Sequence, residues 1–292
     1  MQAFLAQLVN GLAMGGIYAL LVLGMNLLML VRNIVHHCFS HIVVLDVCVG
    51  WLVYTKTQSV ILAFLLMFVC GVLATVATEP LFRPLSKRGA ELETIVLAMG
   101  VGIIITELIA QCFNKGQVIA VPNELKLVNK QIRWGVVSFS VGDIIAIAVC
   151  IVAALLIVWF LFKTSEGRAI RSMALNLRVS RMLGVPFGRT GVIGFGIAGL
   201  LTAVIALVWM MCMGYASSEL GDSLAVKAII LMLFAGQGDI RGGILSSFLM
   251  GVVESMATTY LPGKWTNAIF YGAIMLIIIW RPNGLFAKQA KD

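Results

Sequence analysis

Charged residues are scarce in this 292-residue chain: Asp, Glu, Lys and Arg together make up 12% of it, whereas hydrophobic residues make up 61%. Soluble domains contain roughly 45–50% apolar residues. A soluble fold could not keep so many Leu, Ile, Val, Phe and Met side chains away from water. The composition therefore excludes soluble enzymes, secreted disulfide scaffolds and disordered chains, and it predicts an integral membrane protein.

The cysteines are few and unpatterned. None of the six has a Cys-x-x-Cys spacing, and nearly all lie in apolar runs, where a thiol is usually a small buried hydrophobe. We therefore expect no disulfides and no cysteine-based metal site. The net charge of +8 does not indicate nucleic-acid binding, because in a membrane protein excess Lys and Arg mark the cytoplasmic loops.

Motifs of catalysis are also missing. Nothing matches Gly-x-x-x-x-Gly-Lys-Ser/Thr, and the nearest stretch, 184–190, has three residues between its glycines and Arg189 where the lysine would stand. The sequence has no His-Glu-x-x-His motif and no recognisable Ser/His/Asp set. We expect a protein that is not an enzyme and needs no cofactor, so that any ATP is hydrolysed in separate subunits.

Long apolar runs fill most of the chain. A bilayer requires about 20 apolar residues per spanning helix, and eight hydrophobic segments qualify when the split pair 224–235 and 243–260 is counted as one. They lie at 3–30, 34–54, 59–78, 92–111, 141–162, 190–213, 224–235 with 243–260 after it, and 266–280. The stretch 224–235 is too short to cross comfortably and predicts a half-helix or a tilted span. The expected fold is all-α, a polytopic membrane protein with about eight transmembrane or partly spanning helices.

Basic residues gather in alternate loops. One set of loops contains 14 of the 21 Lys and Arg residues, at 32, 83–88, 163–189, 241 and 281–291, and the other set contains six. Because cytoplasmic loops carry the excess of positive charge, we expect the N-terminus outside and the C-terminus inside.

Two connecting segments are long. The outer one, 112–140, alternates Ile132, Trp134 and Val136 and predicts a small extended structure that offers a docking surface outside. The inner one, 163–189, repeats apolar residues at helical spacing among arginines, and Gly184 ends the pattern. The apolar positions are Ile170, Met173, Ala174 and Leu177. Such an amphipathic helix either rests on anionic lipid or docks in a groove of a cytoplasmic partner.

Small residues recur every four positions in two spans. One stripe is Gly243, Ser247, Gly251 and Ser255, and the first span contains Gly11 and Gly15. Stripes of this kind allow helix backbones to approach closely in lipid. We expect close helix packing at both of them.

Ionisable residues inside spans are costly and mark functional or paired positions. Glu254 and Lys227 lie at similar depths, roughly 9 Å and 6 Å inside their outer helix ends at about 1.5 Å of rise per residue, so an ion pair is expected, with a polar conduit as the alternative. The cluster of His36, His37, Cys38 and His41 with Asp46 predicts a polar helix facing the solute path. Metal or proton handling is its alternative, since His37 and His41 would share a helix face.

Several short segments together carry a resemblance. They are Asn10-Gly11 with Gly15, Tyr18-Ala19-Leu20 and Gly24; EPLFRPL at 79–85 with Thr94 and Gly100; Gly167-Arg168-Ala169 and Leu183-Gly184-Val185; Gly236, Gly238 and Gly242 with Gly251 and Glu254; and Arg281-Pro282-Asn283-Gly284-Leu285. In this order and at these spacings, the chain resembles the LivH-type permeases of branched-chain amino acid ABC importers over essentially its full length.

The resemblance implies a single transmembrane permease domain over 1–292, with 163–189 as cytoplasmic coupling loop and 112–140 as periplasmic loop, in a bacterial inner membrane. It implies four kinds of partner: a second homologous permease, two ATPase subunits, a periplasmic substrate-binding protein and the membrane lipid. The helix at about 167–184 would be the coupling helix. Its expected residues are Gly167, Arg168, Arg171, Leu177, Arg181 and Gly184. Those expected on the path or in a membrane charge pair are His37, His41, Asp46, Lys227 and Glu254.

Two segments depart from the family pattern. His36-His37-Cys38-Phe39-Ser40 with Asp46, and the turn with Gln237, Asp239 and Arg241, replace the residues usual there. These departures leave the solute open, with urea or a short amide as rival to an amino acid. Two other functions stay open as well: an ion-coupled secondary transporter that uses the membrane His, Asp and Glu residues, and an interaction subunit without transport of its own.

Overall fold

The computed structural model describes residues 2–113, 117–126, 131–134, 137–236 and 238–260, and the single positions 268, 270–272, 275, 276 and 279. Its helices are α1 (Gln2–Arg32), α2 (Phe39–Thr57), α3 (Val60–Arg88), α4 (Glu91–Cys112), the 3-10 turn η2 (Asn123–Lys126), α5 (Val141–Lys163), α6 (Ser165–Leu175), α7 (Leu177–Met182), α8 (Phe187–Cys212), α9 (Leu220–Ala235) and α10 (Ile240–Tyr260). Its strands are the short β1 (Ile119–Ala120), β2 (Gln131–Trp134), β3 (Val137–Ser140) and β4 (Tyr215–Ala216).

Seven of the described helices are long and apolar enough to cross a membrane: α1, α2, α3, α4, α5, α8 and α10. The all-α polytopic fold is therefore confirmed. The short stretch at 224–235 forms α9, whose 16 residues span about 24 Å at 1.5 Å per residue, less than the bilayer core of about 30 Å. The predicted stretch 266–280 falls largely outside the described residues, as do Gln237 and the motif at 281–285.

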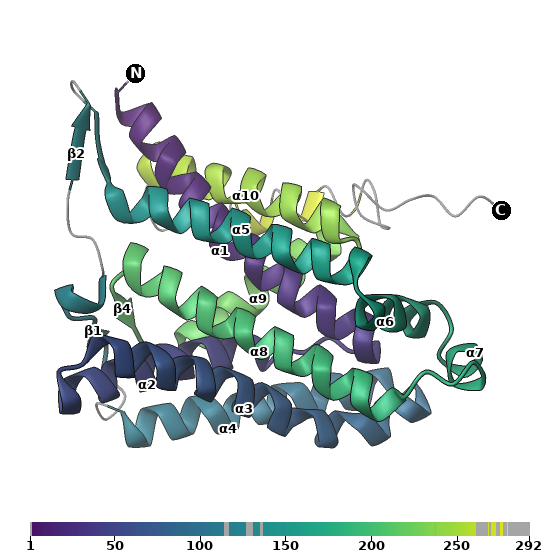
Figure 1. Ribbon diagram of the computed structural model, residues 1–292. Coiled ribbons are helices and arrows are strands. Elements are labelled where there is room, and N and C mark those ends of the chain that lie inside the picture. Colours follow the sequence, from purple (N-terminus) through teal and green to yellow (C-terminus); the bar gives the residue numbers. More distant parts are fainter. Residues whose placement is uncertain are drawn as a thin grey trace.

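The long helices run between two ends that differ in structure (Figure 1). One end contains the N-terminus and the strands, where β1 pairs antiparallel with β4 and β2 with β3. The β2–β3 hairpin confirms the extended structure expected in the 112–140 loop, although Val136 lies outside the described residues. The opposite end contains α6 and α7. Arginine-rich and arginine-poor loops thus lie at opposite ends, in keeping with the expected orientation, which remains a prediction.

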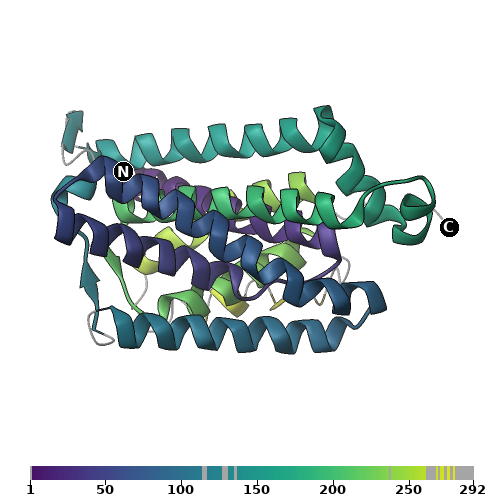
Figure 2. The ribbon, with the colours of Figure 1, turned by 60° about the horizontal axis from the view of Figure 1, so that its bottom comes forward.

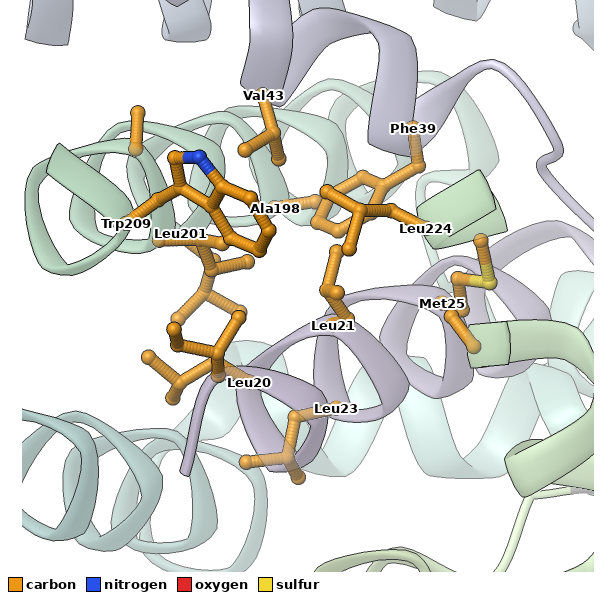
Figure 3. Close-up of a cluster of buried hydrophobic side chains, with 14 of the residues drawn as sticks. Leu20, Leu21, Leu23, Met25, Phe39, Val43, Ala198, Leu201, Trp209 and Leu224 are labelled. Carbon is orange, nitrogen blue, oxygen red and sulfur yellow. The ribbon is translucent and has the colours of Figure 1, made fainter. Parts of the chain in front are cut away.

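Helix α1 forms the centre of the molecule, and its middle is almost wholly buried. Figure 3 shows its side chains meeting residues of α2, α8 and α9 in one apolar cluster. The labelled members are Leu20, Leu21, Leu23, Met25, Phe39, Val43, Ala198, Leu201, Trp209 and Leu224. Helices α4 and α5 lie on opposite sides of this core (Figure 2). Both expose many large apolar side chains, which suits contact with lipid.

The two small-residue stripes pack against each other. A Cβ atom added to Gly11 would lie 2.7 Å from Val252 Cα, and one added to Gly251 would lie 2.4 Å from Gly15 Cα. Ser255 also donates a hydrogen bond of 2.8 Å from its hydroxyl to the Gln7 carbonyl. The predicted close packing is confirmed, and it joins α1 to α10.

The second span begins later than the sequence suggested. We expected it from residue 34, but α2 starts at Phe39, after the non-helical segment 33–38. Asn33 ends α1 with a φ of 56°, a left-handed conformation that a helix cannot continue. His36 and His37 therefore precede α2, and the expectation that His37 and His41 share a helix face is wrong.

Candidate functional site

A charged cluster connects α1, α9 and α10 inside the bundle. Lys227 Nζ donates hydrogen bonds to Glu254 Oε1 at 2.5 Å and to the Tyr18 hydroxyl at 3.0 Å. The Tyr18 hydroxyl donates in turn to Glu254 Oε2 at 2.6 Å. The structure therefore brings Lys227 and Glu254 together, as their depths suggested. Sequence reasoning did not identify Tyr18 as their third member, because the depth argument compared only charged residues.

This cluster borders a cavity of about 590 Å³ at the strand-bearing end of the bundle. Its wall combines the charged cluster and several amides and hydroxyls with apolar side chains. The lining residues that matter to the argument are Asn10, Met14, Tyr18, Leu224, Lys227 and Glu254. A cavity with both signs of charge beside apolar surface suits a small zwitterion with an apolar side chain.

A second polar cluster lies where α2 begins. The rings of His37 and His41 have their centroids 5.3 Å apart, and His41 Nε2 lies 3.0 Å from Asp222 Oδ1 at the start of α9. His37 and His41 thus come together although His37 is outside the helix. Sequence reasoning missed Asp222; its position two residues before the short stretch 224–235 was the available signal.

His36 points elsewhere. Its Nε2 lies 3.1 Å from Thr78 Oγ1. The Thr78 hydroxyl already donates its hydrogen to the Thr75 carbonyl. Thr78 Oγ1 is therefore the acceptor in the contact with His36, and His36 Nε2 is the donor. Phe82 and Phe195 contact its ring. Burial lowers the pKa of His36 to about 3, and the imidazole is therefore neutral at physiological pH.

Asp46 stands apart from both clusters. It is buried on α2 at the crossing of α3 and α8, where a Cβ atom on Gly71 would lie 2.6 Å from Asp46 Oδ2 and 2.7 Å from Thr202 Oγ1. The five residues expected on the path or in a charge pair therefore occupy three places: Lys227 with Glu254, His37 with His41, and Asp46 alone.

The 163–189 loop contains two helices instead of one. Asn176 ends α6, and its side-chain oxygen accepts a hydrogen bond of 3.1 Å from the Val179 N–H at the start of α7. The prediction of a single helix at 167–184 is wrong. The backbone of Asn176 is extended and interrupts the helix, and the Asn176 side chain caps a new helix there. Gly184 has a φ of +83° and ends the second helix, as predicted.

The apolar side chains of this loop are divided between the interior and the surface. Ile170 and Met173, expected to face either lipid or a partner, are buried in the protein itself. The exposed apolar group consists of Leu175 at 89%, Val179 at 47%, Met182 at 81% and Leu183 at 78% of their surface. We call these four residues the loop patch. The exposed apolar surface thus consists of the loop patch, whereas helical periodicity had indicated the face with Ile170 and Met173.

The six residues expected to couple the loop lie along these two helices. Gly167 is buried at the α5–α6 corner, where a Cβ atom would come within 2.2 Å of the Phe160 carbonyl oxygen. The Arg171 guanidinium lies 4.7 Å from the centre of the Phe162 ring. Leu177 is half-buried, and Arg168 and Arg181 are exposed.

Phe187, at the start of α8, links the loop to the transmembrane helices. Its ring centre lies 4.3 Å from the Arg181 guanidinium and 3.8 Å from that of Arg32, at the end of α1. Arg32 forms a buried ion pair with Glu79 of α3, which also binds Arg83 at 2.8 Å. A chain of contacts therefore runs from α7 through α8 and α1 to α3. Sequence reasoning did not identify Phe187.

A family profile described as "Branched-chain amino acid transport system / permease component" matches residues 7–279. The chain belongs to this permease family. The resemblance seen in the sequence is confirmed. The protein is accordingly a permease component of a transport system and a multi-pass protein of the bacterial inner membrane.

Individual relatives of the permease are distant but similar along most of its length. It is 24% identical to the high-affinity branched-chain amino acid transport system permease protein BraD of Pseudomonas aeruginosa, over 98% of this chain and 96% of the relative. It is 21% identical to LivH of Escherichia coli K12 over the same shares. The autoinducer 2 import system permease protein LsrC of Enterobacter sp. is 25% identical over 90% of this chain and 75% of the relative. No solved structure matches the permease.

Proposed function

We propose that this permease forms half of the translocation path of an ATP-driven importer for a branched-chain or related amino acid. A second homologous permease forms the other half, two cytoplasmic ATPase subunits supply the energy, and a periplasmic binding protein delivers the solute. The similarity to BraD and LivH along almost the whole chain supports this proposal.

The observation that carries the ATPase assignment is the loop patch. The exposed residues are Leu175 on α6, Val179 and Met182 on α7, and Leu183 directly after α7. Both helices lie at the end of the bundle opposite the strands (Figure 1). Contiguous exposed apolar side chains mark interaction surfaces. Arg168, Arg178 and Arg181 are exposed on the same two helices. An apolar ridge among arginines suits insertion into a groove with an acidic rim on a cytoplasmic partner.

The contacts of Phe187 supply a route from that surface to the path. A shift of α7 moves Arg181, which rests on Phe187 at the start of α8. Phe187 in turn contacts Arg32, whose ion pair with Glu79 joins α1 to α3. Packed side chains and buried ion pairs transmit such shifts because they cannot deform continuously.

The cavity beside Lys227 and Glu254 is the proposed solute contact of this half of the path. The ammonium of Lys227 would bind the carboxylate of an amino acid, and the carboxylate of Glu254 its amino group. Met14 and Leu224 supply apolar wall for the side chain. When a zwitterion binds, Lys227 and Glu254 would give up their contact with each other and each would pair with a charge of the solute. Both membrane charges thus stay paired.

The test is purification of the permease from its native membrane, with identification of the subunits that accompany it. The proposal predicts a second permease and an ATPase, and it predicts that Leu175→Glu with Met182→Glu releases the ATPase while the permease pair persists. A matched control is Leu175→Met with Met182→Leu, which keeps both side chains apolar and of similar volume and should leave the ATPase bound. ATPase retention by the Leu175→Glu, Met182→Glu variant would contradict the proposed docking surface.

A further inference from the structure

Three potential metal ligands converge between the α1–α2 connection, α2 and α9. One ligand atom from each of His37, His41 and Asp222 lies within 4.8 Å of the other two. The closest pair is His41 Nε2 and Asp222 Oδ1, at 3.0 Å. No other group of three or more such residues comes together in the part of the chain that the structure describes.

His37 and His41 each have one ring nitrogen that forms no hydrogen bond with the described residues. Among the described residues, neither His37 Nδ1 nor His41 Nδ1 has a hydrogen-bond partner, and both atoms are buried. His41 as a whole is 1% exposed. A buried polar atom without a partner destabilises the fold. His41 faces Asp222 through Nε2, so a cation in the cluster can satisfy the unpartnered nitrogen of His37 but not that of His41.

We propose that His37, His41 and Asp222 form a binding site for a divalent transition-metal ion of the zinc class. Two imidazoles and one carboxylate are a donor set that Zn²⁺ and Co²⁺ accept. Tetrahedral ligands at about 2.0–2.1 Å from the metal lie about 3.4 Å from one another. A side of the ligand triangle as long as 4.8 Å would therefore shorten by about 1.4 Å, and the 3.0 Å side between His41 and Asp222 would lengthen by about 0.4 Å. Asp222, 59% exposed, has the freedom to rotate.

Three protein ligands leave a fourth coordination position for water or another small ligand. The exposure of Asp222 gives an ion access to the site, whereas the buried His41 holds the inner side. A bound ion would fasten the first turn of α9 to the start of α2. This site is distinct from the Lys227–Glu254 cluster and stands whether or not the proposed amino acid import is correct.

The test is a titration of Co²⁺ into the purified, nucleotide-free membrane complex, with the permease carrying an affinity tag that contains no histidine. Co²⁺ in a low-coordinate nitrogen–oxygen site gives visible d–d absorption. The expected result is one such ion per permease chain, displaced by Zn²⁺, and a Zn²⁺-dependent rise in Tm. Asp222→Asn, which keeps the size and a hydrogen-bond acceptor, should weaken Co²⁺ binding at least tenfold and abolish the rise in Tm.

His36→Gln is the matched control, because His36 is adjacent in sequence but binds Thr78 instead of facing the cluster. It should keep the Co²⁺ spectrum and the affinity of the unmodified complex. The proposal is overturned if the unmodified complex binds no Co²⁺ at this stoichiometry. Equal binding in the unmodified complex and in Asp222→Asn, or loss in His36→Gln alone, overturns it as well.

Discussion

The guanidinium of Arg181 lies 4.3 Å from the centre of the Phe187 ring, and so joins the last turn of α7 to the first turn of α8. The same ring lies 3.8 Å from the guanidinium of Arg32 at the end of α1. One aromatic side chain therefore contacts one cation from the 163–189 loop and another from the central helix. We propose that movement of the loop reaches the membrane-spanning core through Phe187.

Replacing Phe187 by Leu should uncouple ATP hydrolysis from solute uptake. Leucine retains an apolar side chain but removes both cation–π contacts, each worth about 0.5–2 kcal/mol. The ratio of uptake to ATP hydrolysis in reconstituted vesicles should fall at least fivefold. Phe187→Trp preserves the ring and should keep most of the coupling; equal loss in both variants would refute a role for the ring.

Gly184 offers a test of the loop that depends on backbone conformation. Its φ is +83°, and a Cβ atom there would meet nothing within 4 Å, so substitution introduces strain without a clash. Gly184→Val should reduce coupling while membrane insertion stays intact, because β-branched residues strongly disfavour positive φ. Asn tolerates this region, so Gly184→Asn should couple nearly normally. The measurement is again the uptake-to-hydrolysis ratio, and unimpaired coupling in the Val variant would disprove the role given to this turn.

The Lys227–Glu254 pair should behave as a unit in stability measurements. Removing one partner leaves the other charge buried and unpaired, which lowers the free energy of unfolding by about 3–5 kcal/mol in buried pairs. We expect Lys227→Met and Glu254→Gln each to lower the Tm of the purified permease, and the double variant to recover much of the loss. Strictly additive losses in a double-mutant cycle would mean that the two side chains do not interact.

The crossing of α1 and α10 requires glycine at its closest point. A Cβ atom on Gly251 would lie 2.4 Å from Gly15 N and Cα, so Gly251→Ala must force the helices apart. We expect a marked drop in Tm or loss of the monodisperse peak in size-exclusion chromatography. Gly100→Ala on α4 is the control, because a Cβ atom there meets nothing within 4 Å; similar behaviour of both variants would contradict the packing.

Helical spacing was sufficient to predict the contacts that depend on one face of a long helix. Gly11 and Gly15 are four apart on one helix and Gly251 belongs to a stripe of the same spacing on another, so close packing at both stripes followed from periodicity. Lys227 and Glu254 could be paired in advance because unpaired charges are expensive in a membrane. The order of the seven long helices that the structure describes followed from apolar runs in the same way.

Contacts between residues that are far apart in the sequence could not be predicted in this way, because they depend on how distant helices pack. Tyr18, Asp222 and Phe187 are ordinary residues in their local sequence, and they become partners of Lys227, His41 and Arg32 only when distant helices meet. The break at Asn176 was hidden because apolar spacing continues on both sides of it. The same spacing assigned Ile170 and Met173 to a face that meets lipid or a partner, whereas both are buried in the permease itself.

The most direct measurement is uptake of labelled leucine, isoleucine and valine into vesicles that contain the purified complex, with the binding protein outside and ATP inside. The account predicts uptake of at least one of them that requires ATP, persists when the pH gradient is collapsed, and stops in the Leu175→Glu, Met182→Glu variant. Uptake by the permease alone, driven by a pH gradient without any ATPase subunit, would contradict it and would favour ion-coupled transport.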